Sequence, residues 1–205
     1  MKTSIIIFLL YLTCLSCTQS KDRKTIMNKA LTEENDIIID TTKVLKEELV
    51  LHPTEGKWYY HNQPYTGFSL KFHSNDTLSE KTGYYKGKRE GMAKKWSENG
   101  TLRIESYYKK NRLEGVYKTW WENGVLASQS YYKKGIKHGL VKEWYATGQL
   151  AKERRLIDGK EEGLQKAWLE NGKLYINYEA KNGRIFGMRR ANSCYQLEDE
   201  NVVTN

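Results

Sequence analysis

A spacing of 24 residues runs through most of this chain and restricts its fold more than any other feature. Six glycines follow this spacing without an insertion or deletion: Gly67, Gly91, Gly115, Gly139, Gly163 and Gly187. The chain has 16 glycines in 205 residues, so chance does not account for six on one lattice. A fixed period of about 20 to 50 residues is typical of repeat proteins. The sequence therefore predicts an array of one small module.

Four other residue positions share the period and define the module. They are Gly100, Gly124, Gly148 and Gly172; Trp96, Trp120, Trp144 and Trp168; Leu78, Leu102, Leu126, Leu150 and Leu174; and Tyr60, Tyr84, Tyr108 and Tyr132. Full copies span 59–82, 83–106, 107–130, 131–154 and 155–178, a partial copy spans 179–190, and we place the whole array at 49–190. Each copy holds two apolar stretches bounded by turn residues, which indicates a β-hairpin. The predicted fold is all-β, an elongated antiparallel meander of stacked hairpins.

The turn after each tryptophan predicts which side chains share a face of the sheet. A three-residue loop at 98–100, with Gly100 in the left-handed conformation, pairs Trp96 with Leu102. A five-residue loop has the same parity and remains an alternative. Alternation along the strands then places five side chains of this hairpin on one face: Met92, Trp96, Leu102, Ile104 and Tyr108. Val116 is expected on that face in the next copy. The predicted repeat core consists of Trp96, Trp120, Trp144, Trp168, Leu102, Leu126, Leu150 and Leu174.

The first 16 residues have the features of an export signal. Lys2 is followed by an apolar run at 5–12, which is too short to span a membrane, and then by Ser16-Cys17. A small residue before a cysteine resembles the bacterial lipobox, which implies that Cys17 carries lipid and begins the mature protein. The alternative is an ordinary signal peptide cut near this point. Thr18 in place of aspartate favours the outer membrane, so we expect a lipid-anchored protein of the cell envelope.

The segments outside the array lack the 24-residue spacing. Residues 17–48 are predicted to be a tether, and the stretch 41–51 at its end forms either a short capping helix or an edge strand. Residues 191–205 form a C-terminal tail. Cys194 has no intramolecular partner if Cys17 is lipidated, so no disulfide is expected.

The repeated frame resembles the MORN-variant repeat, as found in bacterial proteins of the YwqK family. The match is carried by Tyr108, Asn111, Gly115, Trp120, Glu122-Asn123-Gly124 and Leu126, with their counterparts 24 residues away, and covers about 59–190. The resemblance implies stacked β-hairpins and a scaffolding or binding role. The family's antitoxin label implies a partner that the protein would neutralise.

Two sets of residues are candidate binding surfaces. The second aromatic of each copy is predicted to leave the core face and expose an aromatic patch, consisting of Tyr107, Tyr117, Trp121, Tyr131 and Tyr145. The alternative is that the aromatics form the core of a thin sheet. Lysines in equivalent turns should form a basic stripe, consisting of Lys86, Lys88, Lys109, Lys110, Lys133 and Lys134. This stripe could attract anionic lipid or cell-wall polysaccharide, or it could consist of solvated lysines that protect the sheet from edge association.

No residue combination in the sequence indicates catalysis, a cofactor or a metal site. The four histidines, His52, His61, His73 and His138, lack ligand spacing, and a meander of equivalent hairpins predicts a shallow surface without a cleft. The formal charge of +9 suits an anionic partner, but the export signal argues against nucleic acid. We therefore expect a non-enzymatic envelope scaffold that binds another protein. The alternatives are a carbohydrate- or peptidoglycan-binding module and an antitoxin-like protein.

Overall fold

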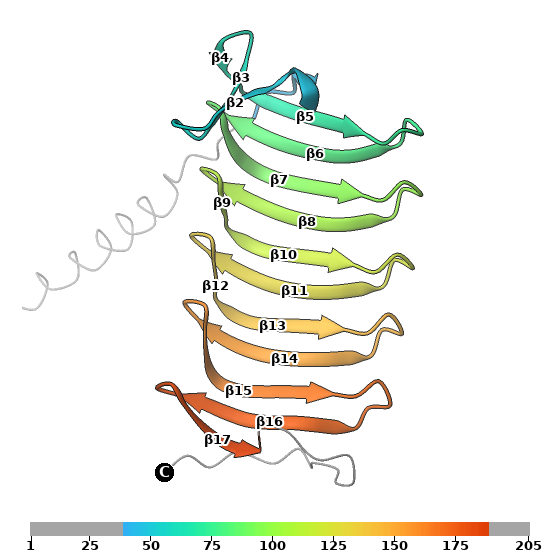
Figure 1. Cartoon of the computed structure of the whole chain (residues 1–205), viewed down its shortest axis with the longest axis vertical. Coiled ribbons are helices and arrows are strands. Elements are labelled where there is room, and N and C mark those ends of the chain that lie inside the picture. Colours follow the sequence, from blue (N-terminus) through green and yellow to red (C-terminus); the bar gives the residue numbers. More distant parts are fainter. Residues whose placement is uncertain (1–38, 189–205) are drawn as a thin grey trace, which may run out of the picture. The chain divides into compact units, whose positions relative to one another are not determined.

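The computed structural model describes residues 39–188, and they form one long β-sheet with a small second sheet at its N-terminal end (Figure 1). The main sheet contains β1 (Lys43–Leu45), β5 (Gly67–Phe72), β6 (Leu78–Tyr85), β7 (Lys88–Trp96), β8 (Leu102–Lys109), β9 (Arg112–Leu113), β10 (Gly115–Trp120), β11 (Leu126–Lys133), β12 (Ile136–Lys137), β13 (Gly139–Trp144), β14 (Leu150–Ile157), β15 (Lys160–Trp168), β16 (Leu174–Lys181) and β17 (Arg184–Met188). The small sheet contains β2 (Val50–His52), β3 (Lys57–Tyr60) and β4 (Gln63–Pro64).

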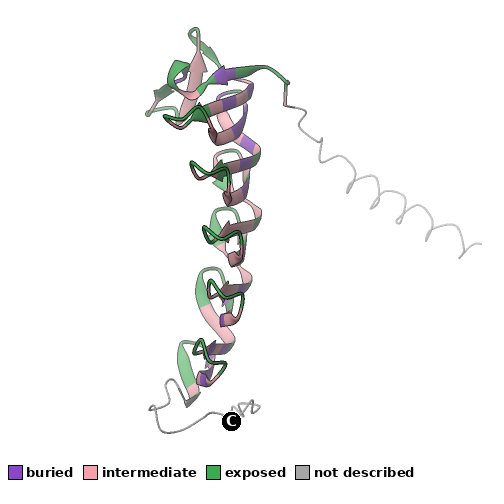
Figure 2. Ribbon diagram, turned by 90° about the vertical axis from the view of Figure 1, so that its right-hand side faces the viewer, coloured by how far each residue is buried: buried purple, intermediate pink, exposed green. Residues whose placement is uncertain are grey.

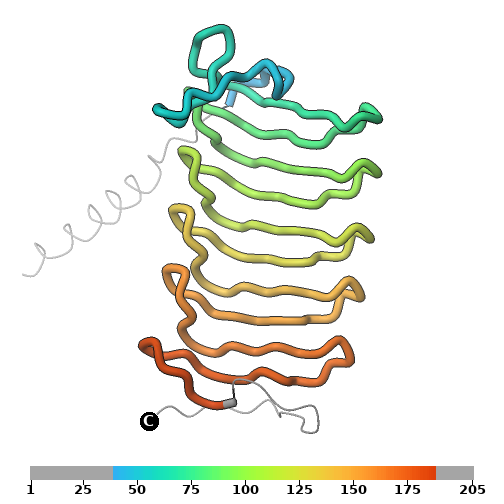
Figure 3. Tube along the Cα trace, in the orientation of Figure 1, coloured from blue at the N-terminus to red at the C-terminus, as the bar shows by residue number. Residues whose placement is uncertain are grey.

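From β5 to β17 neighbouring strands of the sheet are antiparallel, and the chain descends the sheet without a crossover (Figure 3). The short strands β9 and β12 pair only with β8 and β11, so β10 pairs with β8 and β13 with β11. This arrangement confirms the predicted all-β meander of hairpins. At the N-terminal edge, β1 pairs with β5 in parallel, and the 3₁₀ turn η1 (Lys46–Glu48) follows β1 directly. The stretch from 41 to 51 therefore holds both an edge strand and a short helical turn.

The turn that follows each tryptophan has the predicted pairing. Trp96 lies opposite Leu102, the Ser97 N–H donates to the Thr101 carbonyl at 2.9 Å, and Gly100 has a φ of 83°. The connecting loop is therefore the three-residue form, with glycine in the left-handed region where a side chain would be strained.

A β-bulge immediately before the equivalent residue of every hairpin changes the face of the remaining strand. The register shifts between Lys95 and Trp96, and it shifts at the same place before Phe72, Trp120, Trp144 and Trp168. A bulge adds one residue to one strand, so alternation restarts beyond it. The extra residue is Arg103, in the strand that follows the turn, so Met92 and Tyr107 lie on the opposite face from Ile104. Val116 and Tyr131 form the equivalent pair in the next hairpin. The prediction that Ile104 and Tyr108 share the face of Met92 and Trp96 was wrong, because the extra residue reverses the parity of the leucine strand. The expected face of Met92 and Val116 agrees with the unbroken alternation along β7 and β10.

Three glycines of the first lattice lie opposite lattice tyrosines. Gly91 pairs with Tyr108 and Gly115 with Tyr132, and both glycines have a positive φ, 72° and 71°. The same position pairs Gly67 with Tyr84. A left-handed backbone at the start of each strand explains why glycine recurs there.

The most buried apolar cluster lies at the N-terminal end, where the segment before the repeats packs on the sheet. Val44, Leu49, Tyr65 and Tyr84 form it, with Trp58 and Tyr60 against them. Farther along, the lattice tryptophans are only half-buried, because one sheet has no second layer to cover them (Figure 2). Small or polar side chains in mid-strand are the buried ones there, including Ala93, Ser106, Ser130 and Gln165.

Candidate binding surfaces

The sheet has two chemically different faces. Residues that pair across strands share a face, and neighbours within a strand alternate. The tyrosine face carries Tyr84, Tyr108, Tyr117 and Tyr132. The lysine face carries a row of directly paired residues: Lys81, Lys94, Glu105, Lys118, Gln129, Lys142, Glu153 and Lys166.

The row on the lysine face is basic throughout its length. Lys94 forms an ion pair with Glu105 at 2.9 Å, and Lys142 forms one with Glu153 at 3.0 Å. Five lysines against two glutamates leave a formal charge of +3. Lys94, Lys118, Lys142 and Lys166 follow the 24-residue spacing, so this lattice could have been found in the sequence. The sequence did not reveal the whole row, because the bulge changes which residues of the neighbouring strand share a face with these lysines.

An exposed apolar row lies beside these lysines on the same face. Its members are Met92, Tyr107, Val116, Tyr131 and Leu140, each between 43% and 49% exposed. Met92 pairs with Tyr107 and Val116 with Tyr131, so consecutive members are in neighbouring strands. Met92 and Lys94 lie two residues apart in β7, and Val116 and Lys118 repeat that arrangement in β10. The lysine face thus presents an apolar strip with a basic border.

The five aromatic residues predicted as one patch do not lie together. Tyr107 and Tyr131 are on the lysine face, in the apolar row. Tyr117 pairs with Ser130 on the tyrosine face, and its ring meets that of Tyr132 edge-on at 5.7 Å. Trp121 and Tyr145 lie outside the strands, in the turns that follow Trp120 and Trp144. The predicted shared face was wrong, because the bulge and the turn separate positions that simple alternation groups.

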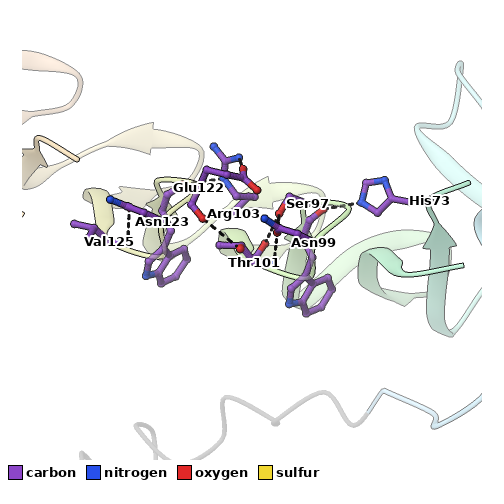
Figure 4. A network of polar contacts seen from close by, with 10 residues as sticks. His73, Ser97, Asn99, Thr101, Arg103, Glu122, Asn123 and Val125 are labelled. Atoms are coloured by element: carbon purple, nitrogen blue, oxygen red, sulfur yellow. Dashed lines mark hydrogen bonds and ion pairs between the residues drawn. The ribbon is translucent and has the colours of Figure 1, made fainter. Parts of the chain in front are cut away.

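Trp121 and Tyr145 connect each repeat to the next. The Trp121 indole N–H donates to the Trp144 carbonyl at 2.9 Å, and the Tyr145 hydroxyl donates to the Trp168 carbonyl at 2.8 Å. His73 contacts the Trp96 carbonyl in the same way at 2.9 Å. The equivalent residue in the second hairpin is Ser97. There the Trp120 carbonyl accepts a hydrogen bond from the Arg103 Nε (Figure 4).

Asparagine side chains join the same turns. The Asn123 amide oxygen accepts from the Val125 N–H at 3.1 Å, while its Nδ2 donates to the Ala146 carbonyl of the next turn at 2.8 Å. Asn75 makes the equivalent bond to the Glu98 carbonyl at 3.0 Å. The Glu-Asn-Gly turns, which recur in three copies, therefore serve the structure of the array.

The predicted basic stripe lies along the opposite ends of the strands. Lys86, Lys110 and Lys134 each occupy the first position of a two-residue turn with φ of 48°, 50° and 53°. The other three members lie at the adjoining strand ends: Lys88 in β7, Lys109 in β8 and Lys133 in β11. The stripe stops after the third turn, because Asp158 and Asn182 hold the equivalent positions. Glu90 and Glu114 support these turns, accepting the N–H of Lys110 and Lys134 at 2.8 Å.

The tyrosine face contains a cleft that the sequence did not predict. It has a volume of about 490 Å³ and lies between the N-terminal segment and β6–β10. Lys46, Trp58, Tyr84, Arg89, Tyr108 and Tyr117 contribute to its lining. Asn111 ties the two sides together, since its Nδ2 donates to the Gly56 carbonyl at 2.6 Å and its Oδ1 accepts the Arg89 N–H at 2.7 Å. The expectation of a surface without a cleft was wrong, because the small sheet covers one end of the array.

Two cations of this cleft are held against aromatic rings. The Lys46 ammonium lies 3.5 Å from the centre of the Trp58 ring and donates to the Tyr84 hydroxyl at 2.5 Å. The Arg89 guanidinium lies 4.3 Å from the centre of the Tyr108 ring. Such contacts are favourable for a cation and fix its position. Among residues 39–188, no carboxylate forms an ion pair with Lys46 or Arg89.

Burial shifts several ionisation equilibria at the cleft. Desolvation lowers the pKa of Lys46 to about 8, although nearby Glu80 opposes the shift. Burial raises the pKa of Tyr84 to about 12. Burial alone would raise the pKa of Glu80, but hydrogen bonds from Lys95 and Thr82 outweigh it, so that pKa lies below its ordinary value. Lys95 and Glu80 form an ion pair at 3.1 Å, so among residues 39–188 Lys46 and Arg89 are the cations of the cleft without a carboxylate partner.

Residues 39–188 contain no cluster of three or more His, Cys, Asp or Glu side chains that could hold a metal ion. Within the same range, no helix is long and apolar enough to cross a membrane. Cys17, Cys194, the signal at 1–16 and the tail at 191–205 lie outside the described residues.

Comparison with known proteins identifies the repeat. Residues 89–110, 113–134 and 137–156 each match the MORN repeat variant. The matches begin 24 residues apart, which is the period of the hairpins in the sheet. No curated protein matches the chain. MORN repeats favour a repeat-based binding or scaffold role. The three matches and the sheet of equivalent hairpins together support a MORN-repeat protein.

Proposed function

We propose that this chain is a non-enzymatic scaffold of the cell envelope, anchored by lipid on Cys17, which binds another protein through the lysine face. The observation that carries the proposal is the apolar row of Met92, Tyr107, Val116, Tyr131 and Leu140, which is exposed in a sheet otherwise rich in charge. Contiguous apolar surface with a polar border is typical of protein interaction sites. The signal-like residues 1–16 and the Ser16-Cys17 pair support the envelope location.

The chemistry of the face defines the partner. Lys94, Lys118 and Lys142 border the apolar row at equivalent positions of successive repeats. A partner that fits would present apolar side chains flanked by carboxylates, because such a surface complements both features. Equivalent contacts would recur every two strands, about 10 Å apart, so affinity would accumulate over several weak contacts.

Site-specific photocrosslinking in cells tests the surface. A crosslinking amino acid at Val116 on the lysine face should capture one defined partner. The same amino acid at Ser128, which pairs with Thr119 on the tyrosine face, is the matched control and should capture little. Lys118→Glu should weaken capture from Val116, because it places a carboxylate against an acidic partner. Equal capture from both faces, or capture unaffected by Lys118→Glu, would contradict the assignment of the surface.

Lipidation is tested separately. Metabolic labelling with palmitate should mark the wild-type protein and leave Cys17→Ala unlabelled. Cys194→Ala serves as the control and should be labelled like the wild type. An unlabelled wild-type protein, or a labelled Cys17→Ala variant, would exclude the anchor and leave the interaction surface to stand on the crosslinking result.

A further inference from the structure

We infer that the cleft between the N-terminal segment and β6–β10 binds a carboxylated sugar, such as a uronic or muramic acid. This site is separate from the proposed protein-binding surface, since it lies on the tyrosine face. Its volume of about 490 Å³ falls in the range of small-molecule sites, about 300 to 1,000 Å³. The ligand class follows from the charge and from the kind of side chains in the lining.

The charge of the cleft calls for one anionic group. Lys46 and Arg89 both line it, and neither has a carboxylate partner among the described residues. Lys46 enters from η1 and Arg89 from β7, so the two cations come from opposite sides of the cleft. Their aromatic contacts hold them in place before a ligand arrives, which reduces the entropy lost on binding. A carboxylate between them would receive charge-assisted hydrogen bonds.

The remaining lining suits a sugar ring better than a purely apolar body. Tyr108, Tyr117 and Ile104 offer apolar surface, against which the C–H groups of a sugar can pack. Thr82, Ser106 and Asn111 add hydroxyl and amide groups among them. Each of them already makes a hydrogen bond within the protein, and the Thr82 and Ser106 oxygens can still accept from a sugar hydroxyl. A sugar therefore offers hydrogen bonds here that an aromatic carboxylate lacks.

Titration calorimetry on the full-length protein in detergent tests the ligand class. Glucuronate or N-acetylmuramate should bind, and glucose should bind at least tenfold more weakly because it lacks the anionic group. Binding of both acids would show that the cleft recognises a carboxylated sugar ring in general. Binding of only one would identify which type of sugar acid is the ligand. If glucose binds as tightly as the acids, if benzoate does, or if no sugar acid binds, the inference is wrong.

Variants place the binding site. Lys46→Met and Arg89→Gln should each weaken binding about tenfold, because each removes one charge-assisted contact. Lys46→Arg keeps the charge and should retain most of the affinity. Lys134→Met, in the basic stripe away from the cleft, should bind like the wild type. Glucuronate should also shift the NMR signal of the Trp58 indole and leave that of Trp144 unchanged.

These outcomes separate the site from nonspecific attraction and from misfolding. Equal losses in Lys134→Met and Lys46→Met would show that general positive charge attracts the acid, which overturns the cleft assignment. Unperturbed NMR signals of Trp144 and Trp168 in the Lys46→Met variant would show that the array remains folded. Failure to bind sugar acids would leave the photocrosslinking result at Val116 unaffected, so the two proposals can fail independently.

Discussion

Lys46 illustrates how one side chain joins the N-terminal segment to the repeats. Its ammonium lies over the Trp58 ring and donates to Tyr84, which is 0% exposed. Burial favours the neutral amine, so the folded protein holds the Lys46 proton less tightly than the unfolded chain does. Stability must then depend on pH through this residue.

The stability of the wild type should rise between about pH 8 and pH 10.5 through Lys46. Its pKa is about 8 in the folded protein and 10.5 in the unfolded chain, so in this window the unfolded chain binds more protons. The charged and titratable groups around it are Glu47, Glu80, Arg89, Lys95 and Tyr84.

Urea unfolding of the wild type, Lys46→Met and Lys118→Met at about pH 7.5 and 9.5 measures this effect. The wild type and Lys118→Met should gain stability relative to Lys46→Met over that interval. The interval ends before Tyr65 and Tyr84 contribute, since their folded pKa values of about 12 cost stability only above about pH 10. Parallel pH profiles for all three proteins would show that Lys46 is not buried as described.

The hairpin is the element that repeats, and its two turns follow different rules. At one end a three-residue loop with glycine and a bulge sets the tryptophan–leucine pair. At the other end a two-residue turn places both central residues at positive φ, where asparagine and glycine are favoured. Lysine at the first position of three such turns costs about 1–2 kcal/mol each in local strain, because its Cβ crowds the carbonyl. Strained residues are often retained for function.

Replacing one strained lysine should therefore stabilise the protein. Lys134→Asn should raise the free energy of unfolding by about 0.5 kcal/mol, because asparagine tolerates the left-handed region better. Lys133→Asn, one residue earlier in β11, is the control and should give no gain, because asparagine is disfavoured in strands. Urea unfolding measures both. A loss of stability in Lys134→Asn would show that the Lys134 side chain stabilises the turn.

Trp120 should affect its own hairpin and the neighbouring hairpins most. The ring is half-buried and pairs with Leu126, so Trp120→Ala should cost about 2 kcal/mol, half the value for a fully buried tryptophan. Hydrogen exchange should increase in β10 and β11 first, because each copy contacts only its neighbours. An equal increase from β5 to β17 would indicate a single cooperative unit.

At the scale of the whole molecule, the array is continuous but its two ends differ. Within residues 39–188, the buried apolar cluster that includes Val44, Leu49 and Tyr84 lies at the N-terminal end, and the cleft lies beside it. Beyond β10 the hairpins continue without a covering layer. The lysine face, in contrast, keeps the same chemistry from β7 to β13. Protein binding through the lysine face should therefore depend on the number of repeats, whereas sugar-acid binding in the cleft should not.

Deleting residues 131–154, which are one period of the lattice, should affect partner binding and sugar-acid binding differently. The join of Ser130 to Arg155 keeps every lattice position in register, so the protein should fold and lose little stability. Capture of the partner from Val116 should weaken, because one set of equivalent contacts is gone. Glucuronate binding should be unchanged, since every lining residue of the cleft lies outside the deletion. Complete loss of partner capture, or loss of glucuronate binding, would contradict this division.

The sequence alone determined the repeat, the hairpins and the pairing of Trp96 with Leu102. These features follow from local chemistry, because glycine, asparagine and the period of the apolar residues act within one copy. The faces of Ile104, Tyr107 and Tyr108 required the structure, since one bulge residue in their strand reverses alternation and has no distinct side-chain signal. The cleft also required it, because the contact between Asn111 and Gly56 joins residues 55 positions apart. Such packing depends on the whole chain, whereas periodicity is visible in any two neighbouring copies.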